Sequence, residues 1–179
     1  MFAEEIKREA VRIKAKYQTS DPFEVCGAMK IRLLRYPMGR SADSCKGFFI
    51  VNARKRLIAV NSDLPEHIRR IICAHELGHA VLHTSAAMCT FHDFSVFEEA
   101  GRQEYEANVF ASEFLLTDGE ILEALETEPE FFSLASCLGV PPEMLDFKLQ
   151  LMQKAGCRIK APCIARSDFL KRDIGRPME

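Results

Sequence analysis

Two histidines and a glutamate interrupt an apolar stretch near the middle of the chain, in the run AHELGHAVLH. His75 and His79 are four residues apart, so on a helix their rings lie one above the other, close enough to bind one ion. Glu76 lies about 100° around such a helix from His75. This spacing is typical of two neutral imidazoles that bind Zn²⁺, beside a glutamate that stays off the metal as general base. The alternative is that both histidines are ordinary buried side chains.

The surrounding residues predict a helix at about 64–83 whose buried face includes both histidines. Apolar residues recur along it at helical spacing, at Ile68, Ile71, Ile72 and Leu82. His75 and His79 fall on the same stripe, where the pattern favours leucine or isoleucine. Asp63 is expected to cap the helix, with Glu66 three residues later. The helix would therefore hold both imidazoles toward the core.

Zinc held by two histidines needs a third protein ligand and leaves one position open for water. A downstream carboxylate is the natural candidate, and five glutamates compete: Glu98, Glu99, Glu104, Glu106 and Glu113. The predicted helix at 103–116 favours Glu104, which shares a face with small alanines that let the two helices approach closely. The other four point away from that face or fall in the loop before it. Asn108, one turn on, is expected to orient Glu104 or a ligand imidazole. Without the histidines, Glu104 would be interpreted as a solvated helix charge.

Three more residues near the motif have roles that the sequence leaves open. His83 lies one turn beyond His79, too far along the helix to meet the same ion as His75, so we expect it to support a ligand. His92 and Tyr105 could each stabilise the oxyanion of peptide hydrolysis. Nothing in the sequence chooses between that role and plain packing.

The remaining pattern predicts a compact α+β fold around this helix. The other expected elements are a helix at 2–17, a short helix capped by Asp21 with Pro22 at its first position, a strand in KIRLLRYP, a hairpin of strands at 47–51 and 56–60, and a helical pair at 129–153. We expect one hairpin strand to lie beside the metal and to pair with an extended peptide. Residues 1–126 would form the metallopeptidase-type domain, 127–156 a helical pair packed on it, and 157–179 an extended or flexible tail.

Composition excludes several classes of protein. A net charge of -2 and a pI of about 6.2 give no electrostatic reason to bind nucleic acid. The helical pair resembles a DNA-reading module, but its second helix opens with Glu143, carries Asp146 and offers only Lys148 as a base. We therefore interpret the pair as structural or as a protein-docking surface. No apolar run reaches membrane-spanning length, and seven cysteines without a Cys-x-x-Cys pair fit a reduced cytoplasmic protein.

The two motifs together resemble the ImmA/IrrE family of metallopeptidase-like proteins. HELGHAVLH is followed by EYEANVFASEFLL, and DPFEV, KGFFIV and RLIAVNSDLPEHIRRIICAHELGH resemble the usual lead-in of the family. The likeness covers about residues 17–116 well and the helical pair more loosely. One departure is Thr117, where family members often carry a proline after the second motif.

The resemblance implies a zincin-like fold with zinc bound by His75, His79 and Glu104 and with Glu76 catalytic. It also implies a role in clearing repressors of mobile elements or stress regulons. We therefore predict a gluzincin-like zinc peptidase that cleaves a partner, a helix-turn-helix repressor, at a specific site. The alternatives are a non-catalytic zinc-binding regulator of the same fold and a non-haem iron site, which also uses two histidines and one carboxylate. A glutamate in the position of Glu76 favours hydrolysis. The sequence does not indicate an oligomeric state.

Overall fold

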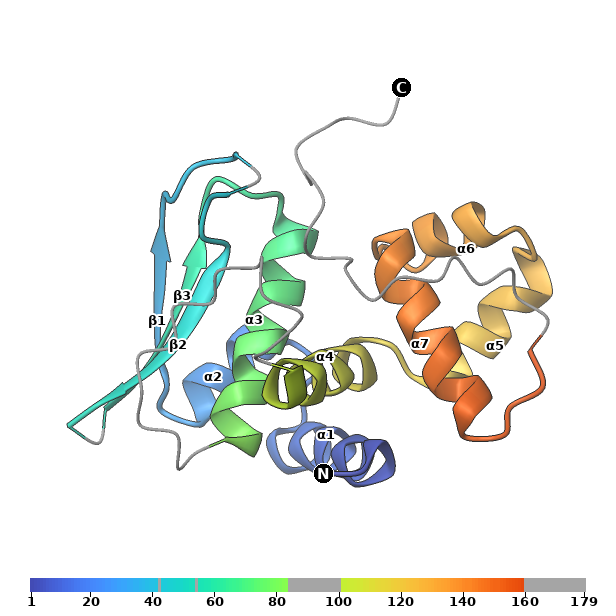
Figure 1. The fold of residues 1–179 in the computed structure, drawn as a ribbon, viewed down its shortest axis with the longest axis horizontal. Coiled ribbons are helices and arrows are strands. Elements are labelled where there is room, and N and C mark those ends of the chain that lie inside the picture. The colour runs from blue at the N-terminus through green and yellow to red at the C-terminus, as the bar shows by residue number, and fades with distance from the viewer. Residues whose placement is uncertain (42, 54, 84–100, 160–179) are drawn as a thin grey trace.

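The structure is a computed structural model that describes residues 1–41, 43–53, 55–83 and 101–159. Its elements run α1 (Ala3–Tyr17), α2 (Pro22–Ala28), β1 (Arg32–Tyr36), β2 (Gly47–Asn52), β3 (Lys55–Asn61), α3 (Glu66–Leu82), α4 (Gly101–Leu115), α5 (Asp118–Thr127), α6 (Phe131–Cys137) and α7 (Pro142–Lys154). A small sheet lies on one side of α3, and α5, α6 and α7 gather on the other side (Figure 1). The predicted α+β class is confirmed. Within these ranges, no helix combines the length and the apolar character needed to cross a membrane.

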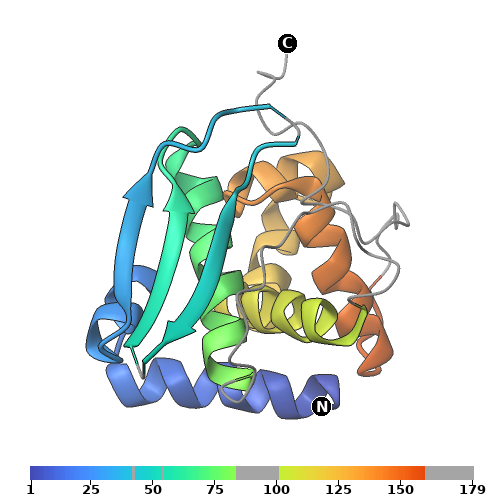
Figure 2. The same ribbon diagram turned by 60° about the vertical axis from the view of Figure 1, so that its left-hand side comes forward.

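The sheet has the strand order β1-β3-β2, with β3 in the centre. β2 and β3 form the predicted antiparallel hairpin, whereas β1 pairs with β3 in parallel. β3 enters the core, where Ile58, Ala59 and Val60 are fully buried. Figure 2 shows β2 as the outer strand next to α3. Because β3 is paired on both sides, only β2 of the two hairpin strands has an edge that could accept a further strand among the described residues.

Of the two helix caps predicted from the sequence, one is present and one is not. Asp21 caps α2 as predicted: its carboxylate accepts a hydrogen bond from the Phe23 amide at 2.9 Å. The predicted cap at Asp63 is wrong, because α3 begins at Glu66 without a side-chain cap. The Asp63 carboxylate instead accepts a hydrogen bond from the Gly39 amide at 2.8 Å. It thereby fixes the loop that follows β1.

Helices α3 and α4 cross closely because the residues at their contact are small. A Cβ atom placed on Gly78 would lie 3.2 Å from the backbone of Ala107 and from the Cβ atom of Phe110. That distance is tighter than an ordinary carbon contact, so even alanine at position 78 would push the helices apart. The predicted close approach of α4, with its alanines, to α3 is therefore present. This separation determines which α4 side chains can contact the histidines of α3.

The C-terminal helices contain a feature that the sequence analysis missed. α5 is a separate helix whose first turn is closed by a capping box: the Glu120 amide donates to the Thr117 hydroxyl, and the Glu120 carboxylate accepts from the Thr117 amide. Thr117 is thus the N-cap of this helix. The expected helical pair is present as α6 and α7. The predicted domain boundary after residue 126 falls at the end of α5, and most of the predicted tail, 160–179, lies outside the described residues.

A buried ion cluster ties α7 to the rest of the fold. Lys148 is fully buried, and its ammonium lies 2.6 Å from the Glu113 carboxylate on α4 and 2.7 Å from Asp118 at the start of α5. Lys7 of α1 also pairs with Asp118. The base that α7 was expected to offer therefore belongs to the core.

Candidate metal centre

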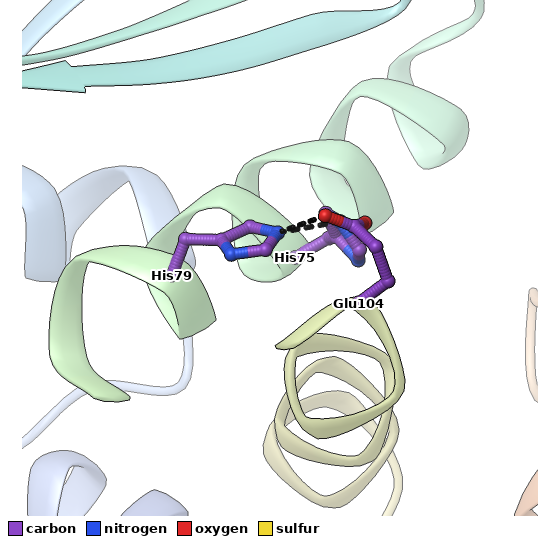
Figure 3. A group of neighbouring side chains, drawn as sticks. All are labelled: His75, His79 and Glu104. Carbon is purple, nitrogen blue, oxygen red and sulfur yellow. Dashed lines mark hydrogen bonds and ion pairs between the residues drawn. The ribbon is translucent and has the colours of Figure 1, made fainter. Parts of the chain in front are cut away.

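Three side chains from α3 and α4 converge on one point (Figure 3). The Nε2 atoms of His75 and His79 lie 3.1 Å apart. The Glu104 carboxylate presents one oxygen to each ring, with Oε2 at 3.2 Å from His75 Nε2 and Oε1 at 3.3 Å from His79 Nε2. Both imidazoles are buried, while Glu104 keeps part of its surface in solvent. The arrangement brings together the three residues that the sequence predicted as metal ligands.

The spacing of these atoms fits one tetrahedral ion. Donor atoms about 2.0–2.2 Å from a zinc ion, at tetrahedral angles, lie roughly 3.3–3.6 Å from one another. The two imidazole nitrogens lie 3.1 Å apart, and each lies within 3.3 Å of a different oxygen of Glu104, so the donor atoms are spaced close to this value. Two imidazole nitrogens and a carboxylate oxygen are also a donor set that zinc accepts in catalytic sites, with the fourth position open to water.

The hydrogen bonds behind the rings turn their lone pairs toward this point. His75 Nδ1 lies 2.9 Å from Asn108 Oδ1. An amide oxygen only accepts, so Nδ1 carries the proton and the neutral ring presents the Nε2 lone pair to Glu104. His79 Nδ1 lies 3.2 Å from His83 Nδ1. Converging acceptors repel one another unless a cation lies between them, so the geometry calls for a proton or a metal ion at the centre.

The electrostatics of His75 lead to the same conclusion. Burial acts to lower the pKa of His75, but the hydrogen bond to Glu104, the charge of Glu76 and the bond to Asn108 outweigh it, and the pKa is raised. The carboxylates thus make this buried pocket attractive to positive charge. The same negative potential would favour binding of a divalent metal ion.

Glu76, the predicted general base, lies close to the first residue of β2. Its side chain is fully buried, and it follows His75 on α3. A Cβ atom placed on Gly47, the first residue of β2, would lie 3.7 Å from Glu76 Cγ and only 2.5 Å from a methyl group of Ile72. Glycine at position 47 therefore lets the edge strand pass directly against the helix that carries Glu76. The predicted general base and the edge strand are neighbours.

Glu106 is a buried acid whose contact the sequence analysis missed. It does not face the converging atoms, in line with its predicted direction, but its Oε2 lies 3.0 Å from His83 Nε2. Arg102 donates to its other oxygen at 3.0 Å, and the Met1 amine also contacts that oxygen. Burial acts to raise the pKa of Glu106, but the bonds from the Met1 amine, His83 and Arg102 lower it to about 2. The sequence signal was weak, because only the crossing of α3 and α4 brings His83 opposite Glu106.

The remaining predicted candidates are less informative. Tyr105 packs edge-on against Phe147 of α7, with ring centroids 5.8 Å apart, so the structure favours packing for this residue. Glu113 belongs to the Lys148 cluster. Glu98, Glu99 and His92 lie outside the described residues.

Comparison with known proteins gives matches that cover both helices of the site. The model of the IrrE N-terminal-like domain family matches residues 26–150. "Uncharacterized immunity region protein 2" of Bacillus phage phi105 is 33% identical over 143 residues, which cover 80% of this chain and 88% of the phage protein. "Metallopeptidase ImmA" of Bacillus subtilis (strain 168) is 29% identical over 157 residues, which cover 86% of this chain and 89% of the relative.

Proposed function

The chain belongs to the metallopeptidase family of the IrrE N-terminal-like domain, and from this premise we propose that it is a zinc-dependent peptidase. Family membership confirms the resemblance to ImmA/IrrE proteins that the two sequence motifs indicated. The observation that best supports catalysis is that the candidate ligand atoms of His75, His79 and Glu104 all lie within 4.8 Å of one another. Glu76 follows His75 on the helix that carries both histidines.

In this proposal, His75, His79 and Glu104 hold the ion and Glu76 acts as general base. Bound there, zinc would polarise the scissile carbonyl and lower the pKa of the attacking water. Glu76 would take the proton from that water and deliver it to the departing amine. Asn108 keeps the His75 ring in the tautomer that metal binding requires. Glu76 is fully buried, which would keep bulk water away from the proton-transfer step.

We assign the peptide-binding strand to β2. It is the hairpin strand with an edge available among the described residues, and its first residue lies against the helix that carries Glu76. An extended peptide could add to this edge through backbone hydrogen bonds, which bind main chain whatever the side chains. Sequence selectivity would then come from docking elsewhere on the substrate.

The proposed substrate is a helix-turn-helix repressor of a mobile element or stress response, cut in an exposed linker in the cytoplasm. One similar protein is named for a phage immunity region and another is named a metallopeptidase, which supports a link between proteolysis and prophage control. A repressor linker supplies an extended segment for β2, and a folded repressor domain supplies a docking surface. Narrow cleavage of one partner follows from this combination.

The test is to incubate the zinc-loaded protein with repressors encoded near its gene and to map the fragments by mass spectrometry. We expect one or a few cuts in a linker, none with the Glu76→Gln variant, and little digestion of denatured casein. If the protein rapidly digests denatured proteins but leaves folded repressors intact, it is a general peptidase and not a regulated one. Tight zinc binding without cleavage of any substrate would leave a non-catalytic regulator, and iron in place of zinc in the purified protein would contradict the proposed cofactor.

A further inference from the structure

Behind the proposed metal ligands lies a second line of hydrogen bonds that runs from α3 to α4. His79 Nδ1 contacts His83 Nδ1 at 3.2 Å, and His83 Nε2 contacts Glu106 Oε2 at 3.0 Å. His83 and Glu106 are both nearly buried, with 9% and 8% of their side-chain surface exposed, so water competes poorly for these bonds. The contacts form a continuous chain from a carboxylate to a ligand imidazole.

The chemistry of these groups fixes the direction of the chain. A carboxylate is only an acceptor when ionised, so His83 must donate from Nε2 to Glu106. The neutral His83 ring then has its lone pair on Nδ1, and this atom can only accept from His79. His79 therefore carries its proton on Nδ1 and presents the Nε2 lone pair to the Glu104 carboxylate and His75.

We propose that Glu106 and His83 are positioning residues that lock His79 in the tautomer able to bind the metal. The inference rests on the proposed metal site and extends it to two residues that touch neither the ion nor the substrate. The two ligand rings are supported differently: His75 is held by a neutral amide, whereas His79 is held through His83 by a carboxylate. A carboxylate behind a ligand imidazole orients the ring and raises its basicity. Glu106 thus strengthens zinc binding from the far side of His83.

The chain offers a matched control for testing this relay. Glu113 lies two helical turns beyond Glu106 on α4, and both residues are 6% exposed. Glu113 pairs with Lys148 and contacts no residue of the relay in the described structure. The variants Glu106→Gln and Glu113→Gln therefore remove the same charge from the same helix at equal burial, and only the first touches the relay.

The first measurement is zinc affinity by competition with a chelator. We expect Glu106→Gln and His83→Leu to weaken zinc binding by about 10- to 100-fold. The double variant should bind no more weakly than His83→Leu alone, because both changes break one chain. His83→Gln should recover most of the affinity, since its amide can accept from His79 and donate to Glu106. Glu113→Gln should stay within about twofold of the wild type.

The second measurement is the tautomer of His79, which NMR reads from the ¹⁵N shifts of labelled histidine in the metal-free protein at mildly alkaline pH. We expect His79 to be protonated on Nδ1 in the wild type and Glu113→Gln, and to become mixed in Glu106→Gln, while His75 stays protonated on Nδ1. Wild-type zinc affinity in Glu106→Gln and His83→Leu, or a His79 tautomer that does not respond to Glu106→Gln, would overturn the relay. A wild-type protein without affinity for zinc would instead contradict the proposed function, and the tautomer measurement would still decide the relay.

Discussion

Helix α4 contributes carboxylates to two buried polar clusters, one at each end. Toward its C-terminal end, Glu113 faces Lys148, whose ammonium also meets Asp118. Near its N-terminal end, Glu104 faces the Nε2 atoms of two histidines. In the first cluster the chain supplies the cation through a lysine. In the second cluster, the facing atoms are two imidazole Nε2 atoms and the carboxylate oxygens of Glu104. All of them are hydrogen-bond acceptors when the rings are neutral and protonated on Nδ1.

The difference separates a cluster that serves the fold from one that we propose serves chemistry. An ion pair closed by a lysine holds α7, α4 and α5 together, but its charges are already satisfied by one another. A cluster of converging acceptors gains stability only when a proton or a metal ion enters it. Removing a member of the first should therefore damage stability and leave metal binding intact, and removing a member of the second should do the reverse.

The largest effect on stability should follow Lys148→Ala. It leaves the buried Glu113 carboxylate without its cation, which costs about 3–5 kcal/mol of unfolding free energy for a buried pair, while the partly exposed Asp118 keeps Lys7 as a partner. Lys148→Met fills the space with an apolar chain and should cost more than a surface change but less than alanine. Urea denaturation of both variants, followed by zinc titration of the folded fraction, gives the comparison. If either variant loses zinc affinity while still folded, the two clusters are not independent.

The next effect is on turnover. Glu76→Gln keeps the shape of the side chain but removes the base, so cleavage of a repressor should fall at least about 100-fold, or roughly 2.7 kcal/mol of barrier. Zinc content and the unfolding midpoint should remain those of the wild type. Cleavage at the wild-type rate would show that Glu76 is not the base.

A smaller effect, on both stability and peptidase activity, is expected from a substitution where β2 contacts α3. The added methyl group in Gly47→Ala would lie 2.5 Å from Ile72 and 2.9 Å from the carbonyl oxygen of Ala59. Relieving this overlap should cost about 1–3 kcal/mol and displace the strand beside Glu76. Gly27→Ala, which meets nothing within 4 Å, is the control. We expect Gly47→Ala to lower peptidase activity more than zinc affinity. Equal activity of the Gly47→Ala and Gly27→Ala variants would show that β2 does not bind the substrate.

The smallest effect concerns pH. Burial acts to raise the pKa of Asp118, but Lys148 and Lys7 outweigh it and lower the pKa below its usual value. A lowered folded-state pKa adds stability above the unfolded pKa, near 4, and this contribution is lost as the pH falls through the folded value. Asp118 is partly exposed, so we expect less than about 1 kcal/mol. Asp118→Asn should be slightly less stable at pH 7 and should lose stability less steeply below about pH 5. Parallel stability curves for variant and wild type would contradict this role.

Sequence patterns anticipated the parts of the fold that local rules control. The His75 and His79 stripe placed both rings on the buried face of a helix, and Asp21 with Pro22 marked the start of α2. The capping box of Thr117 and Glu120 carried an equally local signal for α5, which the sequence analysis did not use. Such features depend only on neighbours in the chain.

Features that depend on tertiary contacts were not accessible in this way. Asp63 had the pattern of a cap, but the loop after β1 offers its carboxylate a competing donor at Gly39. The parallel pairing of β1 with β3 requires the crossover geometry of the whole sheet. Glu106 was correctly placed off the metal face, yet its contact with His83 depends on how closely two helices cross at Gly78.

The most direct test of the difference between the two clusters is the zinc content of purified protein, measured for the wild type, Glu104→Ala and Glu113→Ala. Both variants remove a carboxylate from α4, and only Glu104 belongs to the cluster of converging acceptors. We predict about one zinc per chain in the wild type and in the folded Glu113→Ala protein, and little or none in Glu104→Ala. Zinc retained in full by Glu104→Ala, or lost equally from both variants, would contradict a metal centre built from His75, His79 and Glu104.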